Sequence, residues 1–475
     1  MQKPYPIPSK AKKIIHVLLE HGAADCLLVG GFVRDCLLGL PPKEVDIEVY
    51  GLAYDQIVDI LRRKRFRVGL VGKSFGVVKV DNDIDLSIPR LESKQGSGHK
   101  GFHVTSDPNL AYGQAFARRD FTINAIGMRL SGDLIDPFGG QADMRQKLLR
   151  APTEAFCEDP LRVLRAMQFA GRFGFDLEPH TIELCRSVLP EFGTLSPERV
   201  WGEWYKWATR SQFPAKGLRV LEQTGWIACF PEIAALIGVP QHPARHPEGD
   251  VFAHTCLVCD AAKKITDEMR SNEIPCDERE QAILLFAALC HDFGKPATTT
   301  KNQHGEWSAP NHAAESVTPA TTFLERMLAP GWLLEQVTPL VAEHLAHLIA
   351  PDADVPQDQY IRRLADRLTP SNIRLWAALC RADSLGCGFA TPWGRINRWE
   401  AVAEKLRVRE SRPKPILQGR DLIARGMAPG PEMGRLLQRA YESQLDGVFT
   451  DHDSAMQWLT EREPATVPPG VAETI

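Results

Sequence analysis

The sequence predicts an α+β protein: a mixed α/β head, followed by helical segments only. Two observations predict this order. Up to about residue 145, short apolar strands alternate with short helices and turn glycines. Beyond that point, apolar residues recur mainly at helical spacing. The 475 residues, 44% hydrophobic and 24% charged, are typical of a globular protein with several buried cores. We therefore expect four parts: a head (1–145), a helical neck (146–240), a histidine-containing helical domain (241–390) and a helical tail (391–475).

Charge and cysteine content bear on the possible partners of the protein and on its cellular compartment. A net charge of −4 neither requires nor excludes a nucleic-acid partner, because a basic groove can coexist with an acidic remainder. The 11 cysteines are an odd number scattered through apolar runs, which is typical of reduced thiols. No apolar run reaches membrane-spanning length, and the first residues lack the pattern of a signal peptide. We expect a cytoplasmic protein without a membrane partner.

The most informative stretch is LVGGFVRDCLLGLPPKEVDIEVYG, residues 28–51. A strand ends at a Gly30-Gly31 turn, where the backbone can approach a ligand closely, and a short helix follows. The chain then resumes as a strand in which acidic and apolar residues alternate. Three carboxylates therefore share one face: Glu44, Asp46 and Glu48. Such a face suits Mg²⁺, which prefers oxygen ligands shared with substrate phosphates.

Two further motifs carry charged side chains at regular spacing. In RRDFTINA, a helix would make Asp120 and Asn124 neighbours, with Arg118 and Arg119 at its start. Arginine can hold phosphate oxygens through two hydrogen bonds at once. In EDPLRVLR, we expect a helix with an acidic N-cap and arginines at every third position, forming a strip against which a base could lie. This strip consists of Asp159, Arg162 and Arg165.

The third part carries a different chemistry. His254 lies on an apolar helix, His291-Asp292 ends another helix in LLFAALCHDFGKP, and Asp383 follows in CRADSLG. Imidazole nitrogens and carboxylate oxygens from several helices suit a divalent transition metal, which can polarise phosphate and activate water. His312 and His344 fall between these positions.

The head and neck motifs together resemble the class II tRNA nucleotidyltransferases (CCA-adding enzymes) and the bacterial poly(A) polymerases. The resemblance implies a nucleotidyltransferase head in which the two metal carboxylates fall on Glu44 and Asp46. Glu44 departs from the Asp of the family pattern, and Asp46 with Glu48 is the alternative pair. Asp85, in DNDIDLSIPR, matches an acidic position of the family and is a candidate third carboxylate, with a strand-end aspartate as the alternative.

The resemblance also implies roles for the remaining motif residues. Nucleotide would bind at Gly30, Gly31, Arg34, Arg118, Arg119, Asp120, Asn124, Asp159, Arg162 and Arg165. The arginines Arg34, Arg118 and Arg119 would hold the triphosphate. Asp120 and Asn124 would lie near the sugar, and Asp159 and Arg162 would read cytosine or adenine without a template. The substrates would be tRNA, CTP and ATP. The cofactor would be Mg²⁺, bound as two ions that activate the RNA 3′-hydroxyl and steady the pyrophosphate.

The pattern His254, His291, Asp292, Asp383 resembles the HD phosphohydrolase superfamily. The resemblance implies a bound Ni²⁺, Mn²⁺, Co²⁺ or Zn²⁺ and hydrolysis of 2′,3′-cyclic or terminal phosphates. His312 and His344 match positions that hold further ligands or phosphate contacts in some members. A structural metal, or a domain retained for RNA binding, would leave the same residues.

Three alternatives to a CCA-adding enzyme remain: a poly(A) polymerase, a CC-only or A-only adding enzyme, and an HD phosphohydrolase whose head merely binds nucleotides. Two segments bear on tRNA. Residues 92–104, rich in Gly, Lys and Ser, predict a mobile loop that could switch specificity between C and A. The basic tail predicts contact with tRNA. We expect a monomer or a homodimer.

Overall fold

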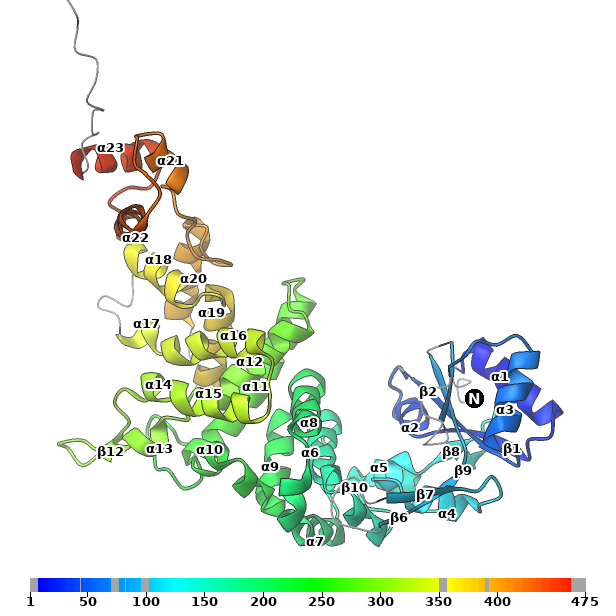
Figure 1. Ribbon diagram of the computed structural model, residues 1–475. Helices are drawn as coiled ribbons and strands as arrows, with labels where there is room; N and C mark the ends of the chain where they lie inside the picture. The colour runs from blue at the N-terminus through cyan, green and yellow to red at the C-terminus, as the bar shows by residue number, and fades with distance from the viewer. Residues whose placement is uncertain are drawn as a thin grey trace, which may run out of the picture. The chain divides into compact units, whose positions relative to one another are not determined.

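The computed structural model describes residues 7–42, 44–69, 77–81, 83–94, 102–349, 357–388 and 393–462. The chain forms two compact units, Met1–Pro231 and Glu232–Ile475. In the first unit a sheet is joined to a group of helices, and the second unit is almost entirely helical (Figure 1). None of the helices in these ranges is long and apolar enough to cross a membrane.

The head of the first unit is built on a mixed seven-stranded sheet of order β3-β4-β5-β2-β1-β8-β9. Strands β2 and β5 are parallel, whereas the other neighbouring pairs are antiparallel. Helices α1 and α3 lie on one side of the sheet and α2 on the other (Figure 1). The elements are α1 (Ser9–Glu20), β1 (Asp25–Val29), α2 (Gly31–Leu37), β2 (Val45–Tyr50), α3 (Tyr54–Arg63), β3 (Val68–Gly69), β4 (Val77–Val80), β5 (Ile84–Ser87), β6 (Arg90–Lys94), β7 (Phe102–Ser106), α4 (Tyr112–Ala117), the 3₁₀ helix η2 (Thr122–Asn124), β8 (Gly127–Met128), β9 (Leu134–Ile135) and α5 (Gly140–Gln146).

The neck completes the first unit. Helix α6 packs against α8 and α9, and Trp204 and Trp207 of α8 are fully buried there. The Trp-rich stretch 201–207 thus places two indoles in a helical core, where they contribute apolar burial. The elements are β10 (Leu148–Leu149), η3 (Glu154–Glu158), α6 (Leu161–Phe173), β11 (Asp176–Leu177), α7 (Pro179–Ser187), η4 (Leu189–Thr194), α8 (Pro197–Arg210), α9 (Pro214–Thr224), η5 (Trp226–Cys229) and, at the border of the two units, α10 (Pro231–Ala234).

The second unit is organised around α12, in which every residue from Gln281 to Cys290 is buried. Helices α11, α16 and α19 pack around it, so the apolar run 282–290 has no solvent face. The elements are α11 (Val251–Ser271), α12 (Glu278–Cys290), α13 (Lys295–Thr298), β12 (Thr300–Lys301), β13 (Trp307–Ser308), α14 (His312–Glu315), α15 (Val317–Arg326), α16 (Gly331–Glu343), α17 (Ala346–Ile349), α18 (Asp358–Arg367), α19 (Ile373–Gly386), α20 (Gly394–Lys405), α21 (Gly419–Ile423), α22 (Pro431–Leu445) and α23 (His452–Arg462).

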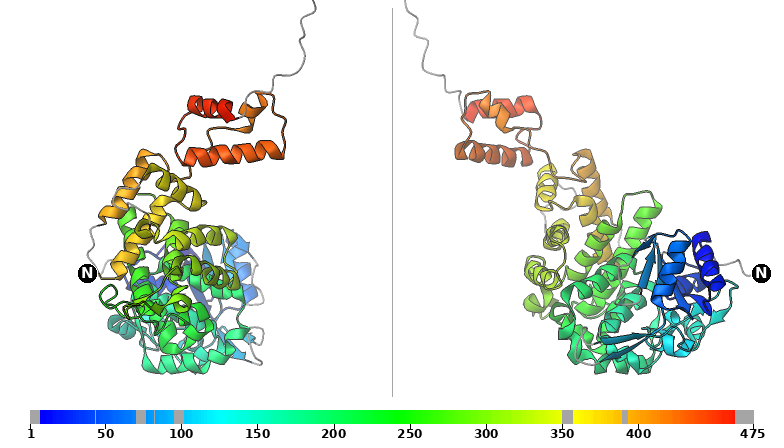
Figure 2. Two further views of the ribbon diagram at one scale, coloured as in Figure 1. Left: turned by 90° about the vertical axis from the view of Figure 1, so that its left-hand side faces the viewer. Right: turned by 45° about the vertical axis from the view of Figure 1, so that its right-hand side comes forward.

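The last three helices form a small cluster with its own apolar core, which includes Leu417, Leu436 and Trp458 (Figure 2). Helix α20 instead packs against α18 and α19, with Trp399 beside Trp376. The α+β class predicted from the sequence is confirmed: a mixed sheet in the head is followed by helices.

The predicted loop at 92–104 is partly wrong. β6 and β7 pair antiparallel from Arg90↔Ser106 to Lys94↔Phe102, so the strands extend into both ends of the segment. Phe102 and Val104 belong to the aromatic and β-branched types that favour strands, although the segment as a whole shows no regular spacing of apolar residues. Residues 95–101, the glycine-rich centre of the predicted loop, lie outside the described residues.

Candidate functional site

Three carboxylates gather near the middle of the head sheet. Asp46 on β2 lies opposite Asp85 on the parallel strand β5, and Glu44 lies exposed just before β2. Burial raises the pKa of Asp46, and the charges of Asp85 and Glu44 raise it further against the opposing effect of Arg119. Lys79 Nζ lies 3.1 Å from Asp85. This mutual repulsion would be relieved by a cation, so the arrangement fits an oxygen-bound divalent ion.

Glu48 shares a strand face with Asp46 but is fully buried and has other partners. Tyr50 Oη donates a hydrogen bond of 2.6 Å to one of its carboxylate oxygens. The Arg119 guanidinium lies 3.3 Å from the other oxygen, and that of Arg118 lies 3.7 Å from it. Glu48 therefore acts as the counter-ion of two arginines, which leaves Glu44 as the accessible neighbour of Asp46.

Gly30 lies close to a positively charged and a negatively charged side chain. Its φ of +63° is a conformation that glycine adopts without strain. A Cβ built there would lie 3.2 Å from Nη1 of Arg119 and 3.5 Å from Oδ2 of Asp46. The Gly-Gly turn thus brings the backbone close to an arginine and to a candidate metal carboxylate.

Arg34 is buried and occupied by protein partners. Its Nε donates to Asp35 at 2.8 Å, and its Nη1 donates to the side-chain oxygen of Asn124 at 2.8 Å. The guanidinium also lies over the rings of Phe169 and Phe173, at 5.2 and 5.0 Å from their centroids. In this structure Arg34 links the head to α6, and the triphosphate role expected for it remains a prediction.

The helix expected for RRDFTINA is present only as the short 3₁₀ helix η2, and not as an α-helix that begins at the arginines. Helix α4 ends at Ala117, so Arg118 lies at a helix end rather than a helix start. Asp120 Oδ1 accepts a hydrogen bond from the Phe121 amide at 2.8 Å, and this local bond competes with helix continuation. Asp120 and Asn124 still meet, since Nδ2 of Asn124 donates to Asp120 Oδ1 at 2.8 Å.

The EDPLRVLR residues join the neck to the head. Helix α6 begins at Leu161, whose amide bonds Oδ1 of Asp159 at 3.1 Å. Arg162 is buried and donates to the carbonyls of Ala155 and Arg118, both at 2.6 Å. These bonds fix the orientation of the Arg162 guanidinium, and nothing in them identifies a base.

The third residue of this strip, Arg165, bonds the head directly. Its Nε donates to Asp120 Oδ2 at 2.8 Å. Burial acts to raise the pKa of Asp120, but Arg165 and Asn124 outweigh burial and lower it to about 2. Oδ2 of Asp159 in turn accepts a hydrogen bond of 2.8 Å from Nη2 of Arg199. The charges predicted to form a strip against which a base could lie are therefore largely paired within the first unit.

In the second unit, the four residues of the His…His-Asp…Asp pattern converge. Nε2 of His254 lies 3.0 Å from Asp383 and 3.4 Å from Nε2 of His291. His291 Nε2 lies 3.1 Å from Oδ2 of Asp292. We call these four residues, with His312 and His344, the HD centre.

His312 and His344 extend the same centre. His312 Nε2 lies 3.3 Å from Oδ1 of Asp292, and the His344 ring lies 5.3 Å from the rings of both His291 and His312. Two ligand groups result, each with the spacing of metal ligands: His254, His291 and Asp383, and Asp292, His312 and His344.

The histidines present fixed tautomers to this centre. Nδ1 of His291, His312 and His344 contacts the carbonyls of Ala288, Ala309 and Val341 at 2.7 to 2.8 Å. A carbonyl only accepts, so each Nδ1 carries the hydrogen and each Nε2 keeps a lone pair for a metal. Burial lowers the pKa of His344 to about 3, which keeps this imidazole neutral.

Two residues missed by the motif analysis support the HD centre. Nζ of Lys295 lies 2.7 Å from Asp292, and Glu248 Oε1 lies 2.8 Å from Nδ1 of His254. The second contact is a carboxylate–histidine pair of the kind that orients metal ligands. The signal was available: Lys295 ends the HDFGK run, and Glu248 lies in HPEGDVFAHT, six residues before His254.

The donor set fits a divalent transition metal. Both carboxylate oxygens of Asp292 are buried, and neither accepts a well-aligned hydrogen bond from a described residue. Among the described residues, the groups of three or more side chains with metal-ligand spacing all lie in the second unit. The head carboxylates form no such group, as expected where substrate phosphates complete the shell of a Mg²⁺ ion.

Comparison with known proteins covers both units. A family model described as a Poly A polymerase head domain matches residues 26–150, and one described as an HD domain matches residues 251–371. A multifunctional CCA protein from Nitrosococcus oceani is 33% identical over 436 residues, which is 90% of this chain and 99% of that protein. The one from Xylella fastidiosa (strain M23) is 36% identical over 370 residues, 76% of this chain and 83% of its own.

Solved structures show the same fold. The CCA-adding enzyme of Bacillus stearothermophilus, in complex with CTP, aligns with a TM-score of 0.65 over 97% of this chain and 98% of its own. The sequence identity of this pair is 23%.

Proposed function

The chain belongs to the family of multifunctional CCA proteins, and we propose that it adds C, C and A to tRNA 3′ ends from CTP and ATP. The family agrees with the resemblance predicted from the motifs. The observation that carries the activity is the meeting of Asp46 with Gly30, Asp85 and Arg119, which puts carboxylates beside a close backbone approach and a guanidinium.

In the proposed site, Asp46 and Glu44 would hold Mg²⁺, and Asp85 would add negative charge. Bound Mg²⁺ supplies charge neutralisation at the reacting phosphate and a more acidic 3′-hydroxyl. Gly30 gives the nucleotide room next to Asp46. Arg118 and Arg119 would turn from Glu48 towards the triphosphate. Until nucleotide binds, their shared counter-ion Glu48 would hold both guanidinium groups next to the site.

Base selection is proposed for Asp159 and Arg162. Arg162 is anchored on the carbonyls of Ala155 and Arg118, so reading a base would require these bonds to be rearranged or shared. The carboxylate of Asp159 accepts and the guanidinium donates, which together can satisfy the Watson–Crick edge of cytosine or adenine.

We propose a second activity for the HD centre: metal-dependent hydrolysis of 2′,3′-cyclic and terminal phosphates. Its support is the set of fixed Nε2 lone pairs around the buried carboxylate Asp292, which fits a transition-metal ion. A bound metal there would polarise phosphate and activate water. Lys295, next to Asp292, could hold a phosphate oxygen. The candidate metals are Ni²⁺, Mn²⁺, Co²⁺ and Zn²⁺.

The deciding experiment uses tRNA transcripts that end before CCA, after C and after CC. Each is incubated with Mg²⁺ and CTP, ATP or both, and products are resolved at single-nucleotide length. Ordered addition of C, C and A that then stops is expected. An open-ended ladder with ATP alone would mean a poly(A) polymerase, and addition of C or A only would mean a partial activity.

No addition to any transcript would leave the HD phosphohydrolase as the main function. The substitution Glu44→Asp, which restores the family's usual ligand, separates a weakened head from a normal one. A large rise in addition by this variant would show that the natural head is compromised.

Eleven free thiols agree with the cytoplasmic location proposed from the sequence.

A further inference from the structure

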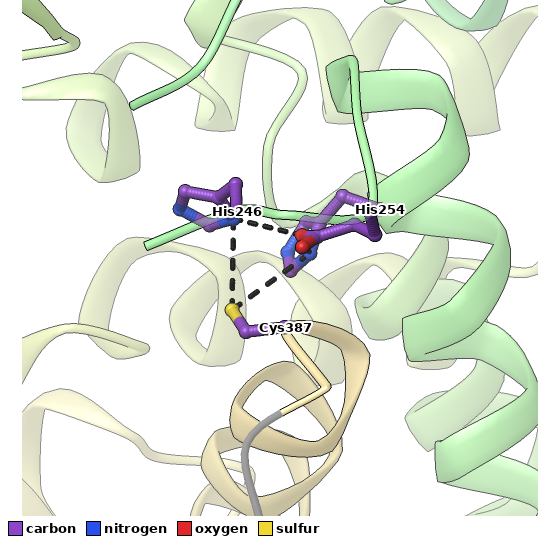
Figure 3. Close-up of side chains that lie close together, drawn as sticks. His246, His254 and Cys387 are labelled. Atoms are coloured by element: carbon purple, nitrogen blue, oxygen red, sulfur yellow. Dashed lines mark hydrogen bonds and ion pairs between the residues drawn. The ribbon is translucent and has the colours of Figure 1, made fainter. Parts of the chain in front are cut away.

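A second cluster of metal-binding residue types lies on the far side of the His254 ring from the HD centre. It consists of His246 and Glu248, in the loop before α11, and Cys387, at the C-terminal end of α19. Figure 3 shows the side chains of His246 and Cys387 beside that of His254. His254 uses Nε2 towards Asp383, whereas its Nδ1 faces this cluster. The two groups of ligands therefore occupy opposite edges of one imidazole.

The spacing within the cluster matches a tetrahedral metal site. Sγ of Cys387 lies 3.6 Å from Nδ1 of His246. With bonds of about 2.3 Å to sulfur and about 2.0 Å to nitrogen, a tetrahedral Zn²⁺ ion separates the two ligand atoms by roughly 3.5 Å. Glu248 Oε1 lies 2.9 Å from the same Nδ1, so all three side chains converge.

One atom in the cluster lacks a partner. Oε2 of Glu248 is buried and has no hydrogen-bond partner among the residues that the structure describes, although the side chain is only 6% exposed. The other oxygen, Oε1, is engaged by both His246 and His254. A buried carboxylate oxygen without a donor is costly, and a cation would offset that cost.

The charges also balance. Glu248 carries −1 and a Cys387 thiolate would carry −1, which together neutralise a divalent ion. On binding, the thiol would release its proton to solvent, and the Nδ1 hydrogen of His246 would move to Nε2, leaving the imidazole neutral.

We propose that His246 Nδ1, Glu248 Oε2 and Cys387 Sγ form a second cation site, suited to Zn²⁺ and separate from the HD centre. A thiolate together with imidazole and carboxylate is a set that Zn²⁺ accepts, whereas the HD centre offers only nitrogen and oxygen. The ion would tie the loop before α11 to the end of α19. It would also hold Glu248, and through Oε1 of Glu248 the tautomer of His254.

Cobalt distinguishes the two sites, because only a thiolate ligand gives a sulfur-to-cobalt charge-transfer absorption in the near ultraviolet. Metal-free full-length protein is titrated with Co²⁺ while absorption and bound metal are recorded. We expect this band in the wild type, its loss in Cys387→Ser, and one ion fewer bound per chain. Since His291 belongs to the HD centre alone, His291→Ala should keep the band.

The matched control is Cys229→Ser, another half-buried thiol, which should keep the band. Thermal unfolding of each variant checks that it is folded. X-ray absorption of the Zn²⁺-loaded wild type gives a test that needs no variant, with a sulfur neighbour expected at about 2.3 Å. A wild type without the band, a band that survives in Cys387→Ser, or Zn²⁺ with only nitrogen and oxygen neighbours would overturn the proposal. These readouts do not depend on either proposed activity.

Discussion

The head and the HD centre differ in how completely their candidate metal ligands are assembled. In the head, Asp46 is half-buried, Glu44 is exposed and Lys79 already contacts Asp85, so the protein supplies few ready ligands. In the HD centre, His254 and His291 are fully buried and point Nε2 atoms at a common region. In the proposed function, the head site would be completed by an ion that arrives with its substrate, whereas the HD centre would hold a resident ion.

The difference follows from ligand chemistry. Mg²⁺ is commonly shared with nucleotide phosphates, so a complete protein cage would compete with the substrate. A transition metal gains from several imidazoles fixed by second bonds, such as Nδ1 of His344 to the Val341 carbonyl. The cost of burying those nitrogens is tolerable because each Nδ1 is hydrogen-bonded.

The largest expected effect tests the head alone. Asp46→Asn should lower nucleotide addition about a thousandfold, because a metal carboxylate supports several kcal/mol of transition-state stabilisation. Single-turnover addition to a tRNA ending in CC measures it, and hydrolysis of 2′,3′-cyclic phosphates should be unchanged. Asp59→Asn, an exposed carboxylate of α3, is the matched control. Unchanged addition by Asp46→Asn would remove the metal assignment.

The reverse test targets the HD centre. His291→Ala should lower cyclic-phosphate hydrolysis by more than about 100-fold and reduce the transition metal retained after dialysis, since a first ligand is lost. Addition of CCA should stay at the wild-type rate. His304→Ala, an exposed histidine of the same unit, controls for loss of an imidazole. Intact hydrolysis in His291→Ala would contradict the second activity, and lost addition would show that the sites are coupled.

A smaller effect separates the two glutamates beside Asp46. Glu48→Gln should destabilise the protein by about 3 kcal/mol, because Arg119 and Arg118 would lose a buried counter-ion. Glu44→Gln should change stability by less than about 0.5 kcal/mol, as for exposed sites, while addition falls. Urea unfolding and addition assays on both variants give the answer. Lost addition in Glu48→Gln without a loss of stability, together with normal addition in Glu44→Gln, would make Glu48 the second metal carboxylate.

The smallest effect concerns the pairing of Asp120. Because Arg165 and Asn124 hold its pKa near 2 against burial, Asp120 stabilises the fold at pH values above its unfolded pKa of about 3.9. That contribution, about 2 kcal/mol, is lost as the pH falls through about 2. Asp120→Asn should therefore be less stable than the wild type at pH 7, with the gap narrowing towards pH 2. A gap independent of pH would contradict the ion pair.

Much of both sites could be predicted from residue order. The Gly30-Gly31 turn, the strand that carries Asp46 and the His291-Asp292 doublet are local patterns, and the structure places each on the expected kind of element. The contact of Asp120 with Asn124 was also expected, although a short 3₁₀ helix rather than an α-helix produces it. Spacing along the chain was sufficient wherever the interacting residues are close in sequence.

Sequence alone predicted the α+β class and a head followed by an HD domain, and it supplied the candidate ligands of each site. Only the tertiary structure decided how these side chains are used. Glu44 and Glu48 flank Asp46 at the same spacing in the sequence, yet Glu48 is buried against Arg119 and Tyr50, whereas Glu44 is exposed just before β2. His254 meets Asp383 from 129 residues away. The partner of a polar side chain and its degree of burial depend on segments distant in the chain, so local pattern cannot determine either.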